Sequence, residues 1–154
     1  MTATRNTRVK IASLAPDFYK ALIALDAESA TGLDERLADL VRIRASQLNG
    51  GAYCLDMPTL DARHAGDSEQ RLYLVGAWRE ARKFYSPQEQ AALELTEAIT
   101  LISVDHVPDE AYNAAAEVFD EKELAQLIGL IITINAWNRV GVTGRLEPGH
   151  YNPS

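Results

Sequence analysis

The sequence contains very little cysteine and histidine: one cysteine, Cys54, and three histidines in 154 residues. A single cysteine excludes a disulfide-stabilised scaffold, which needs cysteine pairs, and a cysteine-rich structural zinc site, which needs several thiolates. Positive charge is also in deficit, because 15 Lys and Arg face 22 Asp and Glu and give a net charge of −7. The chain therefore lacks the basic footprint of a nucleic-acid-binding protein.

Long apolar runs are absent as well. The densest one, from Leu124 to Trp137, is interrupted by Gln126, Thr133 and Asn135, whereas a membrane span needs about 18–20 mostly apolar residues. The polar N-terminus is not followed by the apolar core of a signal peptide. We therefore expect a cytoplasmic protein that does not insert into membranes and whose single thiol stays reduced.

What the sequence does contain is apolar residues at helical spacing along nearly the whole chain. Start and stop signals divide it into segments that begin near residues 16, 34, 52, 68, 86, 108 and 120. No alternating strand pattern exceeds about four residues. We expect an all-α fold of about six or seven helices in one domain, 1–154, with short N- and C-terminal arms.

The last expected helix is apolar around nearly its whole circumference. Ten of the fourteen residues from Leu124 to Trp137 are apolar, and a helix of this kind must be buried on all sides. Either it forms the centre of a single-chain core, or self-association covers the excess. In a chain this small we expect self-association, as a homo-oligomer.

Cys54 follows Gly50 and Gly51, near the expected start of a helix. The helix dipole and the free backbone N–H groups at such a position lower the pKa of a thiol and favour the thiolate, which is the form that attacks peroxides. A lone cysteine is otherwise a small buried apolar residue. Position alone leaves both interpretations open.

Two carboxylates, Asp39 and Glu97, lie within apolar stretches of their helices. A carboxylate near a core must be ion-paired, hydrogen-bonded or neutralised, and Arg42 and Arg44 are candidate partners for Asp39. A structural ion pair and a catalytic role both stay open. The histidines are scattered and no phosphate-binding motif occurs, so we expect neither a metal nor a cofactor.

Residues 40–57, LVRIRASQLNGGAYCLDM, resemble the core of the AhpD-like alkylhydroperoxidases of the carboxymuconolactone decarboxylase superfamily. The resemblance continues in order through 69–72, 77–80, 86–100 and 134–139. It implies an all-α AhpD-like domain that assembles into dimers, trimers or hexamers. Peroxidase members of the family use a Cys-x-x-Cys-x-x-x-His motif, whose second cysteine attacks the peroxide and whose first resolves the sulfenic acid. The histidine and an acid on the preceding helix relay protons.

Only part of this motif matches. By the resemblance, Cys54 corresponds to the peroxide-attacking cysteine and Asp39 to the acid, which is usually a glutamate. Gly51 stands at the resolving-cysteine position and Pro58 at the histidine position. No intrachain disulfide can then form, and no imidazole lies beside the thiol as a base. Pro58 also offers no N–H to the carbonyl of Cys54, so we expect the helix to bend or to start late.

Three functions therefore compete. The first is a one-cysteine peroxidase or peroxide sensor, an antioxidant role in which Cys54 is oxidised and an external thiol reduces it. The second is an enzyme without thiol chemistry, like the lactone decarboxylases of the superfamily, for which the sequence shows no set of polar pocket residues. The third is a non-catalytic oligomer or small-molecule binder. We expect peroxidase activity to be weak and limited to the one-cysteine route.

Overall fold

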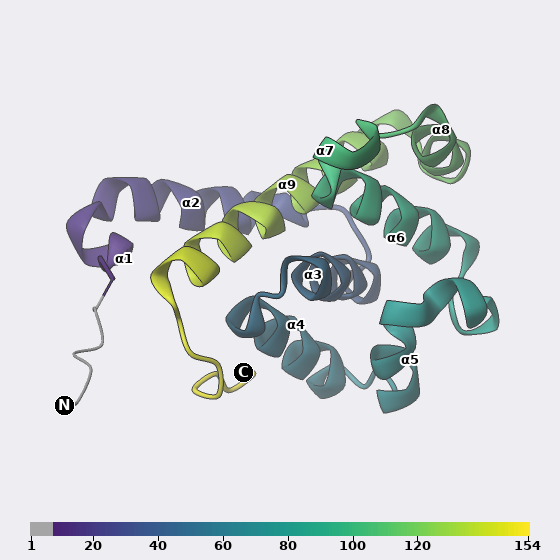
Figure 1. Ribbon diagram of the computed structural model, residues 1–154. Helices are drawn as coiled ribbons and strands as arrows, with labels where there is room; N and C mark the ends of the chain where they lie inside the picture. The colour runs from purple at the N-terminus through teal and green to yellow at the C-terminus, as the bar shows by residue number, and fades with distance from the viewer. Residues whose placement is uncertain (1–7) are drawn as a thin grey trace.

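All regular secondary structure in the described residues, 8–154, is helical in the computed structural model of the protein (Figure 1). Within this part of the chain, nine α-helices and two 3-10 helices follow one another: α1 (Ile11–Leu14), α2 (Pro16–Ser29), α3 (Glu35–Asn49), α4 (Ala52–His64), α5 (Glu69–Leu74), η1 (Val75–Glu80), η2 (Arg82–Phe84), α6 (Pro87–Thr100), α7 (Ile102–Asp105), α8 (Asp109–Val118) and α9 (Glu121–Gly144). The all-α class is confirmed. The number of helices exceeds the expected six or seven because α1 and α7 are single turns of four residues. Part of the expected N-terminal arm, residues 1–7, lies outside the described residues.

The capping signals in the sequence start and end helices as predicted. The Asp34 side chain accepts a hydrogen bond from the backbone N–H of Leu37 at the start of α3. Ser86 and Glu89 form a reciprocal capping box at the start of α6. Gly50 ends α3 with a φ of 64°, a left-handed conformation that glycine adopts without a steric penalty. This glycine lets the chain reverse directly into α4.

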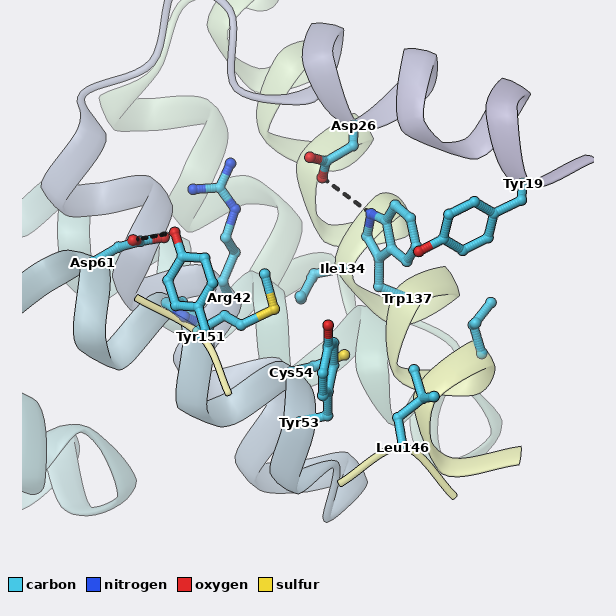
Figure 2. A pocket seen from close by; sticks show the side chains of 13 residues that line it. Tyr19, Asp26, Arg42, Tyr53, Cys54, Asp61, Ile134, Trp137, Leu146 and Tyr151 are labelled. Atoms are coloured by element: carbon cyan, nitrogen blue, oxygen red, sulfur yellow. Dashed lines mark hydrogen bonds between the residues drawn. The ribbon is translucent and has the colours of Figure 1, made fainter. Parts of the chain in front are cut away.

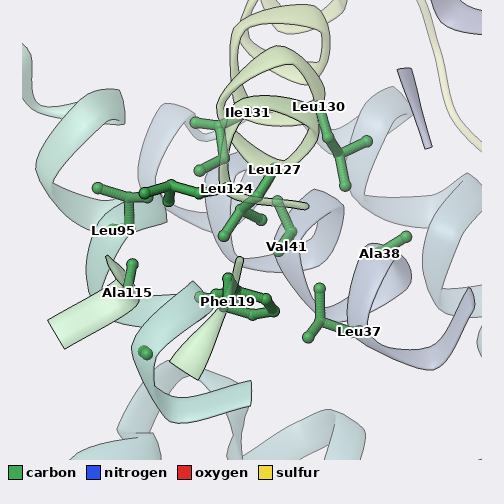
Figure 3. Close-up of a cluster of buried hydrophobic side chains, with 12 residues drawn as sticks. Leu37, Ala38, Val41, Leu95, Ala115, Phe119, Leu124, Leu127, Leu130 and Ile131 are labelled. Atoms are coloured by element: carbon green, nitrogen blue, oxygen red, sulfur yellow. The ribbon is translucent and has the colours of Figure 1, made fainter. Parts of the chain in front are cut away.

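Helix α3 lies in the middle of the molecule, with α4, α6 and α9 packed around it (Figure 1). On one side, Val41 of α3 clusters with Leu127 and Ile131 of α9 (Figure 3). On another, Ile43 of α3 belongs to a second cluster with Trp78 of η1. Burial of each such side chain stabilises the fold by about 1.5–3 kcal/mol. Because α3 is buried on both sides, the residues that it presents to α4 and α9 are held rigidly.

Helix α9 is buried along only part of its circumference. Leu127 and Ile131 are fully buried, but Ile132 is 53% exposed. Apolar residues of α2 are uncovered as well, and Phe18 is 55% exposed. A single chain therefore does not bury α9 on all sides. No helix of the described chain has the length and apolar composition needed to cross a membrane.

Candidate functional site

A cavity of about 350 Å³ opens among α2, α3, α4, α9 and the C-terminal tail, and Cys54 lines it (Figure 2). Tyr53 and Cys54 of α4 form its floor. Trp137 of α9 contributes to one side and Tyr151 of the tail to the other. The walls are mainly aromatic and apolar, with a few polar groups, as in ordinary ligand-binding pockets.

The Cys54 thiol is largely removed from water. Cys54 is 7% exposed, and its Sγ packs against α9, where a Cβ on Gly141 would lie 3.5 Å from the sulfur. Burial raises the pKa of the thiol to about 11. The direction is opposite to the lowering expected from the helix-start position, and of the two interpretations that the sequence left open, the small buried residue describes the surroundings of Cys54.

Gly51, which the family resemblance aligns with the resolving cysteine, packs closely against α9. A Cβ at Gly51 would lie 2.1 Å from Oδ1 of Asn138, which is closer than any real contact. The Asn138 amide cannot easily move, because its Nδ2 donates to Oγ of Ser46 (3.1 Å) and to the carbonyl of Ile134 (2.9 Å). Asn138 thus occupies the space that a side chain at position 51 would need.

Pro58, which the family resemblance aligns with the motif histidine, lies buried inside α4 and contributes to the cavity wall. The expectation that it delays the helix start is wrong, since α4 begins at Ala52. The carbonyl of Cys54 lacks its helical donor at Pro58, and the hydroxyl of Ser46 donates to it instead (3.0 Å). A side chain from α3 therefore satisfies the backbone group that proline leaves unpaired.

Asp39, the second predicted catalytic residue, does not line the cavity. It is buried on α3 and accepts a hydrogen bond from Arg42 (3.2 Å), whose side chain does line the cavity. Burial raises the pKa of Asp39 to about 6 against the lowering effect of Arg42, and repulsion from Asp61 and Glu35 adds to the rise. The described residues show no hydrogen bond between Asp39 and Cys54. Asp39 is therefore connected to the cavity through Arg42.

Glu97, the other carboxylate singled out in the sequence, has structural partners. It accepts hydrogen bonds from Arg44 Nε (3.0 Å) and Trp78 Nε1 (2.7 Å), and also from Arg79. Burial raises the pKa of Glu97, but the three hydrogen bonds together outweigh it and hold the pKa below its ordinary range. Of the two arginines considered for Asp39, Arg44 pairs with Glu97 and Arg42 with Asp39.

The sequence did not reveal two of the charged residues that line the cavity, Asp26 and Asp61. Asp26 accepts a hydrogen bond from Trp137 Nε1 (3.1 Å), and Asp61 accepts one from the Tyr151 hydroxyl (2.6 Å), as Figure 2 shows. The bond to Asp61 raises the pKa of Tyr151 to about 12. The partners are 111 and 90 residues apart, so no local spacing signals them. No group of three or more His, Cys, Asp or Glu in the described chain is arranged to hold a metal ion.

Comparison with known proteins agrees with the fold and the site region. The profile of the Carboxymuconolactone decarboxylase family matches residues 16–98, which is more than half of the chain. The chain is 45% identical over 138 residues to YdfG, an uncharacterized protein of Bacillus subtilis; the match covers 88% of this chain and 92% of YdfG.

Two solved structures share the fold. One is a protein of unknown function from Agrobacterium tumefaciens, proposed to be the antioxidant defence protein AhpD; it has a TM-score of 0.89 and 35% identity, covering 95% of this chain and 100% of that one. The other is the debrominase Bmp8, with a TM-score of 0.77 and 19% identity, covering 90% of this chain and 74% of that one. The protein thus has an AhpD-like helical fold. It belongs to the carboxymuconolactone decarboxylase family.

Proposed function

We propose that the chain binds a small organic molecule in the cavity lined by Cys54, and that any hydroperoxide reduction there is a slow one-cysteine reaction. The composition of the cavity carries this proposal. Its volume of about 350 Å³ and its aromatic walls suit a compact ligand. A small number of charged groups, Asp26, Arg42 and Asp61, provide the means to orient that ligand.

The environment of Cys54 argues against fast thiol chemistry. With a pKa of about 11, only about one thiol in ten thousand is ionised at pH 7. Relative to an ordinary thiol of pKa 9.0, the thiolate is about a hundredfold scarcer. Its higher basicity recovers only about tenfold in nucleophilicity. We therefore expect Cys54 to react with hydroperoxides about ten times more slowly than a free cysteine.

The one-cysteine route is a second candidate because the thiol does line the cavity. In this route the Cys54 thiolate attacks a hydroperoxide oxygen, the O–O bond breaks, and the alcohol leaves after taking a proton. Two molecules of an external thiol then reduce the sulfenic acid to the thiol and release water and a disulfide. Gly51 cannot take part, because it has no thiol.

A lactone decarboxylase-like reaction fits the walls less well. Its substrate class carries a carboxylate, which would meet the carboxylates of Asp26 and Asp61. Among the described residues that line the cavity, Arg42 is the one cation, and it already pairs with Asp39. The charge around the cavity therefore opposes an anionic substrate.

Thiol reactivity is tested with tert-butyl hydroperoxide and dimedone, a sulfenic acid trap, followed by mass spectrometry of the intact protein. We expect modification of Cys54 at pH 7 to be about tenfold slower than that of free cysteine, and absent in Cys54→Ser. The rate should rise about tenfold per pH unit between pH 7 and pH 10, because the thiolate fraction does. Modification faster than that of free cysteine at pH 7 would contradict the proposal.

Ligand binding is tested with 3,3-dimethylbutan-1-ol, a compact neutral probe, by calorimetry and by the shift in Tm. We expect saturable binding and a raised Tm. Leu146→Trp is the control, because Leu146 lines the cavity but is exposed, so a larger side chain there should block the cavity without disturbing the core. Binding that is the same in Leu146→Trp would place the ligand elsewhere.

We also propose that the chain forms a homo-oligomer. The exposed apolar residues Phe18 of α2 and Ile132 of α9 support this, because a second copy covering them would complete the burial of α9.

A further inference from the structure

Four aromatic side chains surround the cavity, each from a different part of the chain. Tyr19 comes from α2, Tyr53 from α4, Trp137 from α9 and Tyr151 from the tail (Figure 2). The Tyr19 and Trp137 rings meet edge to face, with centroids 5.6 Å apart. The faces of aromatic rings carry partial negative charge and attract cations, most strongly where water is excluded.

Two carboxylates complete these walls from opposite sides. Asp26 lies beside Trp137, and Asp61 lies beside Tyr151 across the cavity (Figure 2). Each accepts one hydrogen bond from its aromatic neighbour, while a carboxylate can accept about four. The N–H of Trp137 and the hydroxyl of Tyr151 already donate to these carboxylates, so they do not donate to a ligand. The cavity therefore has unused acceptors and negative charge to offer a ligand.

The positive charge at the cavity is already balanced. Arg42 is ion-paired with Asp39 at 3.2 Å, so its charge is already offset by a carboxylate outside the cavity lining. With Asp26 and Asp61 in the lining and Asp39 behind Arg42, three carboxylates in this region stand against one guanidinium. Asp61 is close enough to Asp39 for charge repulsion between them to raise the pKa of Asp39. A cation placed among these groups would relieve that repulsion.

We infer that the cavity takes an organic cation, with an alkylammonium head group seated among the aromatic rings and balanced by Asp26 and Asp61. This inference rests on the proposed binding function and names its ligand class. The ammonium needs no hydrogen-bond donor from the protein, only aromatic faces and carboxylate oxygens. The volume of about 350 Å³ limits the ligand to a small molecule.

The test compares three probes of nearly the same shape by calorimetry at constant ionic strength. Choline carries a trimethylammonium group, 3,3-dimethylbutan-1-ol carries the neutral carbon equivalent, and 3,3-dimethylbutanoate carries an anion. We expect choline to bind at least tenfold more tightly than the alcohol, and the anion most weakly. Because the shape is nearly constant, a difference in affinity reports on charge.

Substitutions of single carboxylates show which residues produce the preference for choline over the alcohol. Asp61→Asn and Asp26→Asn keep an acceptor for Tyr151 and Trp137 but remove the charge, so each should weaken choline about tenfold. Each should weaken the neutral alcohol by a much smaller factor, so the ratio of the choline affinity to the alcohol affinity should fall. Asp56→Asn is the matched control, since Asp56 also lies on α4 and accepts from the tail, at Gly149 N (3.1 Å), but does not line the cavity. It should leave all three affinities unchanged.

The outcomes separate the two proposals. Equal binding of choline and the alcohol would overturn the cation inference and leave the binding function standing. Tightest binding of the anion would show that Arg42 dominates the cavity, and it would also overturn the inference. No measurable binding of any of the three probes would count against the proposed binding function itself.

Discussion

At the scale of single residues, the position opposite Gly51 decides what thiol chemistry is open to Cys54. Asn138 fills the space beside Gly51 and is tied by its amide to Ser46, which in turn donates to the carbonyl of Cys54. A cysteine at position 51 would therefore need more than the substitution itself. The neighbouring side chains are packed around a glycine and leave no room for a larger residue.

Gly51→Ala should therefore destabilise the protein by about 1–3 kcal/mol, because the new Cβ overlaps with Oδ1 of Asn138. Adding Asn138→Ala should recover part of this loss, so the two changes should not be additive. Gly129→Ala is the control: Gly129 lies within α9 with no atom near its Cβ position, so alanine there should be neutral or stabilising. Urea denaturation of the wild type, Gly51→Ala, Asn138→Ala, the double variant and Gly129→Ala checks this, and additive effects at 51 and 138 would contradict it.

At the scale of helices, Glu97 of α6 links three elements. Its carboxylate accepts hydrogen bonds from Arg44 of α3 and from Trp78 and Arg79 of η1. The side chain is only slightly exposed, so its charge is compensated within the protein. These bonds fix η1 against the central helix α3.

Glu97→Gln should lower the free energy of unfolding by about 1–3 kcal/mol at pH 7, because it leaves two arginines without their carboxylate. The hydrogen bonds lower the pKa of Glu97 from 4.5 in the folded state. The stabilisation is therefore present above about pH 4.5 and is lost as the pH falls through the folded-state pKa. The difference from wild type should shrink in acid. Glu94→Gln, on the same helix, should change stability little at either pH, and a deficit in Glu97→Gln that persists unchanged in acid would rule out this account.

The helices could be predicted from the sequence because their signals are local. Asp34, Ser86 and Gly50 act on backbone groups within a few residues of themselves, and each does so as the spacing indicates. The family motif singled out Cys54, which lines the cavity, and its catalytic role stays a prediction. The rest of the site depends on contacts between distant segments, such as Asp26 with Trp137. Burial also decided the pKa of the thiol, and the sequence alone could not reveal that Cys54 is shielded by α9.

At the scale of the whole molecule, the single chain leaves large apolar side chains exposed to water, which is energetically unfavourable. Phe18 lies on α2 and Ile132 on α9, two helices that pack against each other, and both side chains are exposed. Apolar surface of this kind on a folded chain marks an interaction site.

Light scattering coupled to size-exclusion chromatography should therefore give a mass that is a multiple of 16.9 kDa. Ile132→Glu should shift this mass toward that of one chain, because a charge at a covered apolar contact is costly. Tyr73→Glu is the control, since Tyr73 is exposed on α5, at the far end of the molecule from α1 (Figure 1). A wild-type mass of 16.9 kDa would disprove the oligomer.

The fit between Gly51 and Asn138 also constrains the evolutionary history open to this chain. A cysteine at position 51 would lower the stability of the fold as alanine should, because any Cβ there meets Asn138. Changing Asn138 as well would relieve that overlap but would remove the amide that binds Ser46. A second cysteine therefore carries a stability cost whichever substitution comes first. The packing around Gly51 thus opposes the gain of a second cysteine, independently of which ligand the cavity binds.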